Sequence, residues 1–144
     1  MSAAGRPWQA ESVPPLLIVD AANVVGSVPD GWWRDPAGAA GRLRDALDAV
    51  AADGLRDGPV DLAQPLEVVM VVEGAARRVE SSDAVRVVAA AGSGDDAIVD
   101  LVRPAAGARV CAVVTADREL RARVSELGAH VLGPRALPYA GRRS

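Results

Sequence analysis

Five acidic residues stand where an apolar run ends or where a helical pattern begins. Asp20, Glu73 and Asp117 stand at or just beyond the ends of apolar runs, and Asp95-Asp96 opens a helical pattern. Apolar runs of this kind are typical of strands buried on both faces of a parallel sheet. The carboxyl ends of such strands meet at one edge, where the following helices also begin. We therefore expect all five carboxyl groups to share one rim of the sheet.

Carboxylates crowded at one rim repel each other and raise each other's pKa unless a cation compensates their charge. Mg²⁺ or Mn²⁺ would do so, because these ions prefer oxygen ligands and need only one or two direct carboxylates when others hold their water molecules. Such an ion can activate a water molecule and stabilise the charge of a phosphodiester transition state. The rim therefore predicts a divalent-metal site suited to phosphate chemistry.

Each acidic residue also has a purely structural interpretation. Asp is a favoured N-cap, and taken singly Asp95 and Asp117 are more often caps than ligands. Glu73 followed by Gly74 is ordinary turn chemistry as much as a metal ligand. Asp20 is the hardest to explain in this way, because it closes the most apolar strand and is followed by a predicted loop.

The helical period separates the two members of the Asp95-Asp96 pair. If Ile98 and Val102 mark the buried face, a rotation of about 100° per residue places Asp95 near that face and Asp96 roughly opposite it. Asp100, one turn beyond Asp96, is then solvated. We expect Asp95 to lean inward toward the other acids, and we keep both members of the pair as site residues.

The elements that must position these residues alternate between strand and helix patterns. This alternation implies right-handed crossovers and a mostly parallel sheet covered on both faces, which is an α/β, Rossmann-like three-layer sandwich. A loop with Gly26, Pro29, Gly31 and Pro36 is expected after the first strand. The predicted strands are 16–19, 66–72, 84–90, 110–114 and 130–132, and the predicted helices lie over 39–51, over 93–102 and between Asp117 and Gly128.

The length of 144 residues suits one domain, which we place at 14–137 between a loose arm at 1–13 and a basic tail at 138–144. The core must be aliphatic, because the chain has no Phe and a single Tyr. His130 stands without a partner in the last predicted strand, so we expect it in the core.

The net charge of −3 excludes a strongly basic domain, so any nucleic-acid contact must be local. A single cysteine, Cys111, excludes an internal disulfide and a thiolate zinc cluster, and its apolar surroundings indicate a buried residue in a reducing compartment. No stretch is long and apolar enough to span a bilayer, and the first residues lack the pattern of a signal peptide. We expect a cytoplasmic protein with no membrane partner; a homodimer stays open.

Three short motifs together suggest a family. Residues 17–26 (LIVDAANVVG), 94–99 (GDDAIV) and 113–117 (VVTAD) resemble the motifs of NYN domains in the PIN-like nuclease superfamily, in the same order and on the same elements. The resemblance spans most of residues 15–135. It implies a PIN-like fold.

The resemblance also implies an activity. In the family the positions matching Asp20, Asn23, Asp95, Asp96 and Asp117 hold Mg²⁺ or Mn²⁺ and cleave RNA, so a metal-dependent ribonuclease is implied here. Asn23 would position a metal-bound water or the loop after the first strand.

Two positions depart from the family pattern. Some nucleases of the superfamily carry another acid one turn beyond the last Asp, where this chain has Arg121, with Glu119 on a different face. Glu73-Gly74 stands where Asp-Gly is common, and its longer side chain is a tolerable substitute.

Aromatic and basic residues near the rim are candidates for contact with RNA. Trp32 and Trp33 could stack bases, although at least one of them is expected to roof the first helix instead. Arg78 and the tail residues Arg142 and Arg143 could add further phosphate contacts. The candidates we name are Trp33, Arg34, Arg77, Arg118 and Arg121.

Two other functional classes compete with a ribonuclease. A catalytically inactive RNA-binding or protein-interaction module is favoured by Arg121 and by the acidic net charge. A phosphatase or nucleotide hydrolase is disfavoured, because Ala22 replaces the second acid of an Asp-x-Asp motif and the chain has no Lys for a phosphate-binding loop.

Overall fold

The computed structural model of the chain describes residues 13–29, 31–55, 62–63 and 65–139. Its centre is a five-stranded parallel sheet in the order β3-β2-β1-β4-β5. The strands in that order are β3 (Val85–Ala89), β2 (Glu67–Val72), β1 (Leu16–Asp20), β4 (Cys111–Val114) and β5 (His130–Leu132). The helices are α2 (Ala21–Gly26), α3 (Pro36–Asp53), α4 (Gly94–Ala105) and α5 (Arg118–Glu126), and shorter 3₁₀ helices are η1 (Trp32–Arg34), η2 (Gly74–Arg78) and η3 (Pro134–Ala136).

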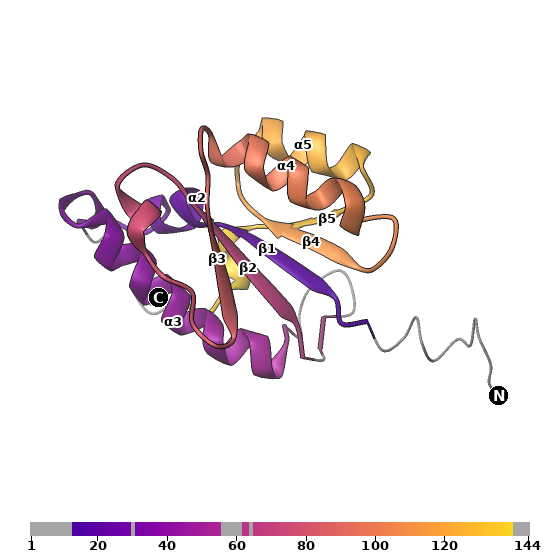
Figure 1. Cartoon of the computed structure of the whole chain (residues 1–144), viewed down its shortest axis with the longest axis horizontal. Helices are drawn as coiled ribbons and strands as arrows, with labels where there is room; N and C mark the ends of the chain where they lie inside the picture. The colour runs from indigo at the N-terminus through magenta and orange to yellow at the C-terminus, as the bar shows by residue number, and fades with distance from the viewer. Residues whose placement is uncertain (1–12, 30, 56–61, 64, 140–144) are drawn as a thin grey trace.

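The sheet lies between two helical layers. α3 covers one face, and α4 and α5 cover the other (Figure 1). The predicted α/β three-layer sandwich with a parallel sheet is therefore confirmed. None of the helices in the described ranges is long and apolar enough to cross a membrane.

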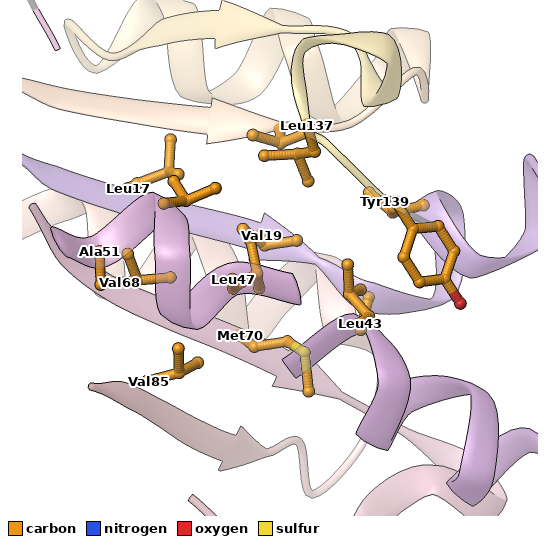
Figure 2. Packing of buried hydrophobic residues seen from close by; sticks show 14 of the residues in the cluster. Leu17, Val19, Leu43, Leu47, Ala51, Val68, Met70, Val85, Leu137 and Tyr139 are labelled. Carbon is orange, nitrogen blue, oxygen red and sulfur yellow. The ribbon is translucent and has the colours of Figure 1, made fainter. Parts of the chain in front are cut away.

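Alternate residues of the central strand enter two separate apolar clusters. Leu17 and Val19 of β1 pack with the side chains of α3 (Figure 2), whereas Leu16 and Ile18 pack with those of α4 and α5. Successive side chains of a strand point to opposite faces, so a strand covered on both faces must be apolar throughout. Each fully buried aliphatic side chain contributes roughly 1.5–3 kcal/mol. A strand of this kind therefore ends where its apolar run ends, and polar residues follow there.

The first long helix follows its prediction closely. The Asp35 carboxylate accepts a 3.0 Å hydrogen bond from the amide of Gly38, and Pro36 occupies the first helical position, where its missing N–H costs nothing. The helix stops at Gly54, whose positive φ of 78° few other residues adopt without strain. The helix predicted over 39–51 is therefore confirmed, and it extends from Pro36 to Asp53.

The segment after Asp20 differs from the predicted loop, because the chain turns at once into the short helix α2. Ala21, Val24 and Val25 are buried on one side of it, at helical spacing. The glycines and prolines within residues 26–36 predict a loop, whereas the spacing of these three buried residues is that of a helix. Asp20 is consequently the N-cap of a helix as well as the end of a strand.

The start of the predicted tail at 138–144 packs against the core, together with the residues just before it. Pro134 begins η3, and Leu137 and Tyr139 are buried against the α3 side of the sheet (Figure 2). The Tyr139 hydroxyl donates a 3.2 Å hydrogen bond to the carbonyl of Ala39. The packed part of the chain thus reaches Tyr139, past the predicted boundary at 137, while Arg142 and Arg143 lie outside the described residues.

The two residues predicted to lie in the core have different outcomes. Cys111 is buried as expected, and this burial raises the pKa of its thiol to about 11. His130 is exposed, which contradicts the prediction. It begins β5, which lies at the edge of the sheet and pairs with β4 alone among the strands of the sheet.

The order of the strands creates a crevice at the middle of the sheet. β1 is central; β2 and β3 follow on one side of it, and β4 and β5 on the other. The chain therefore leaves the carboxyl ends of β1 and β4 toward opposite faces, into α2 and α5. Ligand sites of parallel α/β sheets form at such a reversal of strand order.

Candidate active site

Asp20 is a buried carboxylate at the carboxyl end of β1, with 5% of its surface exposed. Its Oδ1 accepts a long hydrogen bond, 3.5 Å, from the amide of Asn23, and its Oδ2 accepts one of 2.9 Å from the hydroxyl of Thr115. Burial raises the pKa of Asp20, the two hydrogen bonds lower it, and the charges of Asp95 and Glu73 raise it further. The residue is thus a desolvated acid within the electric field of two others.

Thr115 was missed as a site residue in the sequence, where it appears only within the motif at 113–117. It is fully buried at the end of β4, beside Asp20. Its hydroxyl donates to Asp20 and also accepts a 3.1 Å hydrogen bond from the amide of Asp117. The available signal was a hydroxyl that directly follows an entirely apolar strand, since a buried hydroxyl needs partners.

Asn23 joins two segments that are far apart in the sequence. Its side-chain oxygen accepts a 2.8 Å hydrogen bond from the amide of Ala116, in the turn between β4 and α5. This contact holds α2 against that turn. Asn23 therefore positions the loop after β4, whereas the sequence suggested either a metal-bound water or the loop after the first strand.

Glu73 follows β2 and reaches the start of α4. Its Oε1 accepts a 3.2 Å hydrogen bond from the amide of Gly94. A Cβ atom at position 94 would lie 2.9 Å from Oε2, so the carboxylate occupies the space that a larger residue would need. The absence of a side chain at Gly94 thus lets Glu73 lie against the helix start.

The Asp95-Asp96 pair divides as the helical period predicts. Asp95 is half-buried, and its pKa is raised by burial first and then by the charges of Asp117 and Glu73, while Arg123 lowers it. Asp96 is exposed and forms a 3.2 Å ion pair with Arg123. Asp95 is therefore the member that joins the other acids, and Asp96 is directed away from them. Asp100 is exposed, as predicted.

Asp117 is half-buried and caps α5, with its Oδ1 accepting a 3.0 Å hydrogen bond from the amide of Leu120. The capping interpretation of this residue is therefore correct. It does not exclude a second role, because a carboxylate has about four lone-pair sites and this bond occupies one. Asp117 precedes α5 and Asp95 lies in the first turn of α4, so both stand at the edge of the sheet where these helices begin.

The acidic rim, defined here as Asp20, Glu73, Asp95 and Asp117, comes from four different segments that share the carboxyl edge of the sheet. Two of them, Asp20 and Asp95, have raised pKa values, because of their burial first and then because of the charges of other acids in the rim. Within the described ranges, no three His, Cys, Asp or Glu side chains lie close enough together to form a ready-made metal cage. The arrangement fits a hydrated ion held by one or two direct carboxylates, with others reaching its water molecules.

The basic residues proposed for RNA contact differ in their exposure and in their contacts with the protein. Arg121 is half-buried and donates a 2.7 Å hydrogen bond to the carbonyl of Thr115, so it is tied to the site's backbone. Arg77 and Arg118 are exposed, in η2 and at the start of α5. Arg34 is also exposed and lies 5.7 Å from the ring centroid of Trp33.

The two tryptophans have separate environments. Trp32 is half-buried and packs against the α3-side core, which confirms that one of the pair roofs the first long helix. Trp33 is 59% exposed and meets Trp32 edge to face, with ring centroids 6.2 Å apart.

A small cavity of about 60 Å³ adjoins the acidic rim through Glu73. It lies between α2, the start of α3 and η2. The residues that line it are Ala21, Ala22, Val25, Trp32, Pro36, Ala40, Glu73 and Ala76.

Comparison with known proteins bears on the fold. No protein-family model and no curated protein sequence matches the chain. Among solved structures, Rae1 (YacP) from Bacillus subtilis matches with a TM-score of 0.65 at 17% sequence identity, and a Trp-to-Leu mutant of that protein with 0.61 at 19%. Each alignment covers 84% of this chain and 70% of the other.

This chain shares the α/β fold of Rae1 (YacP). At this low identity the likeness concerns the fold alone. In this domain the predicted residues Asp20, Asp95 and Asp117 lie at the same edge of the sheet as Glu73, while Asp96 is exposed and paired with Arg123. Thr115 and Asn23 hold the segments that carry them.

Proposed function

We propose that this domain is a metal-dependent ribonuclease that hydrolyses RNA phosphodiester bonds at the acidic rim, with Mg²⁺ or Mn²⁺ as its cofactor. One observation carries the proposal: the buried carboxylate of Asp20 stands at the switch point within the field of Asp95 and Glu73. Charges of one sign are costly to gather in a desolvated place unless an opposite charge joins them. A divalent cation would supply that charge.

The residues of the rim have distinct tasks in this proposal. Asp20 and Asp95 would bind the ion directly, and Asp117 and Glu73 would accept hydrogen bonds from its water molecules. When bound, such an ion supplies an activated water and stabilises the negative charge that develops on the phosphate. Asp96 is left out of the set, because it is exposed and paired with Arg123.

Other side chains orient the rim and the substrate. Thr115 fixes one oxygen of Asp20, and Asn23 fixes the turn before Asp117, so the two carboxylates keep their relative position. Exposed Arg77 and Arg118 would contact phosphates on either side of the rim, and Trp33 with Arg34 would contact the strand further out. The assignment of RNA as the substrate comes from the resemblance of the three motifs to NYN domains.

The test compares wild type with Asp20→Asn on fluorescent RNA in Mn²⁺, in Mg²⁺ and in EDTA. We expect cleavage by wild type only with a metal ion, and a loss of at least about 100-fold in the variant, since even outer partners of metal ligands cost roughly 10–100-fold. Asp100→Asn is the matched control, because Asp100 is exposed on α4 away from the rim. Equal Mn²⁺-dependent cleavage by Asp20→Asn would refute the proposal.

A second candidate is an inactive RNA-binding or protein-interaction module with the same fold. Arg121 favours it, because some nucleases of the superfamily carry another acid at this position. The guanidinium of Arg121 donates a hydrogen bond to the backbone carbonyl of Thr115. RNA binding that EDTA leaves unchanged, with no cleavage products at high protein concentration, would favour this candidate.

A further inference from the structure

The cavity between α2, α3 and η2 lies beside the acidic rim and shares Glu73 with it. We propose that it binds one unpaired nucleobase of the RNA, adjacent to the phosphodiester at the acidic rim. The identity of the substrate rests on the proposed function; the occupant is argued here from the walls of the cavity.

The position of the cavity connects it to the rim. Glu73 belongs to both, and Ala21 and Ala22 directly follow Asp20 in the chain. A nucleotide whose phosphate lies at the rim therefore has its base within reach of the cavity. The volume of about 60 Å³ holds several water molecules, since each needs about 10–15 Å³. This is room for part of a planar ring system and too little for a whole nucleotide.

The walls favour a flat, apolar ligand. Most of the lining side chains are small and aliphatic, and the one large side chain is the indole of Trp32. Nucleobases stack on aromatic side chains regardless of sequence, because every base has a π face. Trp32 is held in place by the core beneath it and by the edge-to-face contact with Trp33. A fixed aromatic wall loses little entropy when a base packs on it.

The charge of the lining selects a base over a phosphate. Glu73 is the one charged residue among those that line the cavity, and its carboxylate repels phosphate groups. The same carboxylate accepts hydrogen bonds, and its bond from Gly94 occupies only one of about four lone-pair sites. A base that presents N–H groups at its pairing edge satisfies it. Guanine presents two in parallel, so it should bind best.

A base can enter this cavity only when it is neither paired nor stacked in a helix, because extrusion from a duplex costs a few kcal/mol. The RNA recognised here is therefore single-stranded at the cleavage point. The exposed Trp33, with Arg34 beside it, offers a second stacking surface for the neighbouring nucleotide.

The experiment measures binding separately from cleavage. Short fluorescent RNA is titrated with protein in Ca²⁺, and anisotropy is recorded for a uridine run with one central guanosine, for uridine alone and for a duplex of the first sequence. We expect the guanosine strand to bind best and the duplex at least about tenfold more weakly. Ala22→Leu, which fills the mouth of the cavity, and Trp32→Leu, which removes its aromatic wall, should each weaken single-strand binding about fivefold or more.

Ala75→Leu is the matched control, since Ala75 is exposed in η2 and does not line the cavity. Circular dichroism and thermal melting establish that each variant is folded, and Ala22→Leu alone decides the question if Trp32→Leu is not. Equal binding by wild type and Ala22→Leu overturns the cavity proposal, whether or not the protein cleaves RNA. Weakened binding by Ala22→Leu in a protein that never cleaves RNA supports the cavity and refutes the nuclease, whereas a folded wild type that binds no RNA refutes both.

Discussion

The hydroxyl of Thr115 donates a 2.9 Å hydrogen bond to Oδ2 of Asp20, from the end of one central strand to the end of its neighbour. The same hydroxyl accepts a hydrogen bond from the amide of Asp117. One fully buried oxygen thus joins the two carboxyl-bearing segments on either side of the switch point. The orientation of Asp20 in the site depends on this oxygen, which belongs to no acidic motif.

The first prediction concerns this contact. Thr115→Val keeps the shape of the side chain but leaves two buried groups without their partner, so we expect the free energy of unfolding to fall by about 1–3 kcal/mol. The pKa of Asp20 should rise further, because the hydrogen bond lowers it. Urea unfolding and an NMR titration of the carboxyl group measure the two effects. Thr115→Ser keeps the hydroxyl, and identical behaviour of the Val and Ser variants would contradict the prediction.

The second prediction concerns pH in the absence of divalent ions. The pKa of Asp20 in the folded protein lies above its ordinary value of 3.8, so the folded state holds that proton more tightly than the unfolded state. The contribution of Asp20 to stability therefore falls as pH rises from 3.8 through the folded pKa, and stays lower at neutral pH. We expect Asp20→Asn to be more stable than wild type at pH 7 in EDTA, with the difference vanishing at low pH. A variant less stable than wild type at pH 7 would show that the charge is already compensated.

The third prediction adds the metal ion to the same comparison. A ligand that binds only the folded state stabilises it by about 2.7 kcal/mol at one hundred times its Kd. Mn²⁺ should therefore raise the melting temperature of wild type and of Asp100→Asn, and leave that of Asp20→Asn nearly unchanged. Equal shifts for all three proteins would place the binding of Mn²⁺ elsewhere.

The fourth prediction uses the close approach of Glu73 to α4. Gly94→Ala places a Cβ atom 2.9 Å from Oε2 of Glu73, so the flexible carboxylate must move. Because only a side-chain end shifts, we expect a stability change below about 1 kcal/mol together with weaker Mn²⁺ binding and slower RNA cleavage. Gly92→Ala is the control, since a Cβ there meets nothing within 4 Å. The idea fails if both variants cleave RNA at the wild-type rate.

The fifth prediction tests the packed segment after β5. Tyr139 is 4% exposed, so Tyr139→Ala should cost about 3–5 kcal/mol, the usual range for a large aromatic side chain removed from a core. Pro138→Ala, at the exposed neighbouring position, should change stability by no more than about 0.5 kcal/mol. Thermal or urea unfolding measures both effects. If the segment were a free tail, both variants would unfold with the same free energy as wild type.

Local patterns in the sequence determined the elements and the direction of several side chains. Continuous apolar runs indicated strands covered on both faces, and the helical period separated the inward Asp95 from the outward Asp96. Each of these features depends only on the strand or helix that contains the residue, and the repeat of two or 3.6 residues can be recognised in the sequence. The shared edge of Asp20, Glu73 and Asp117 also followed, because parallel strands end on the same side.

The tertiary structure alone decided which of these side chains touch. The bond from Thr115 to Asp20 requires β4 to lie beside β1 in one register, and the bond from Asn23 to Ala116 requires α2 to lie against the following turn. The exposure of His130 and the burial of Tyr139 likewise depend on which strand is at the edge and where the chain crosses the core. Strand order and register arise from the packing of the whole domain, and no local period encodes them.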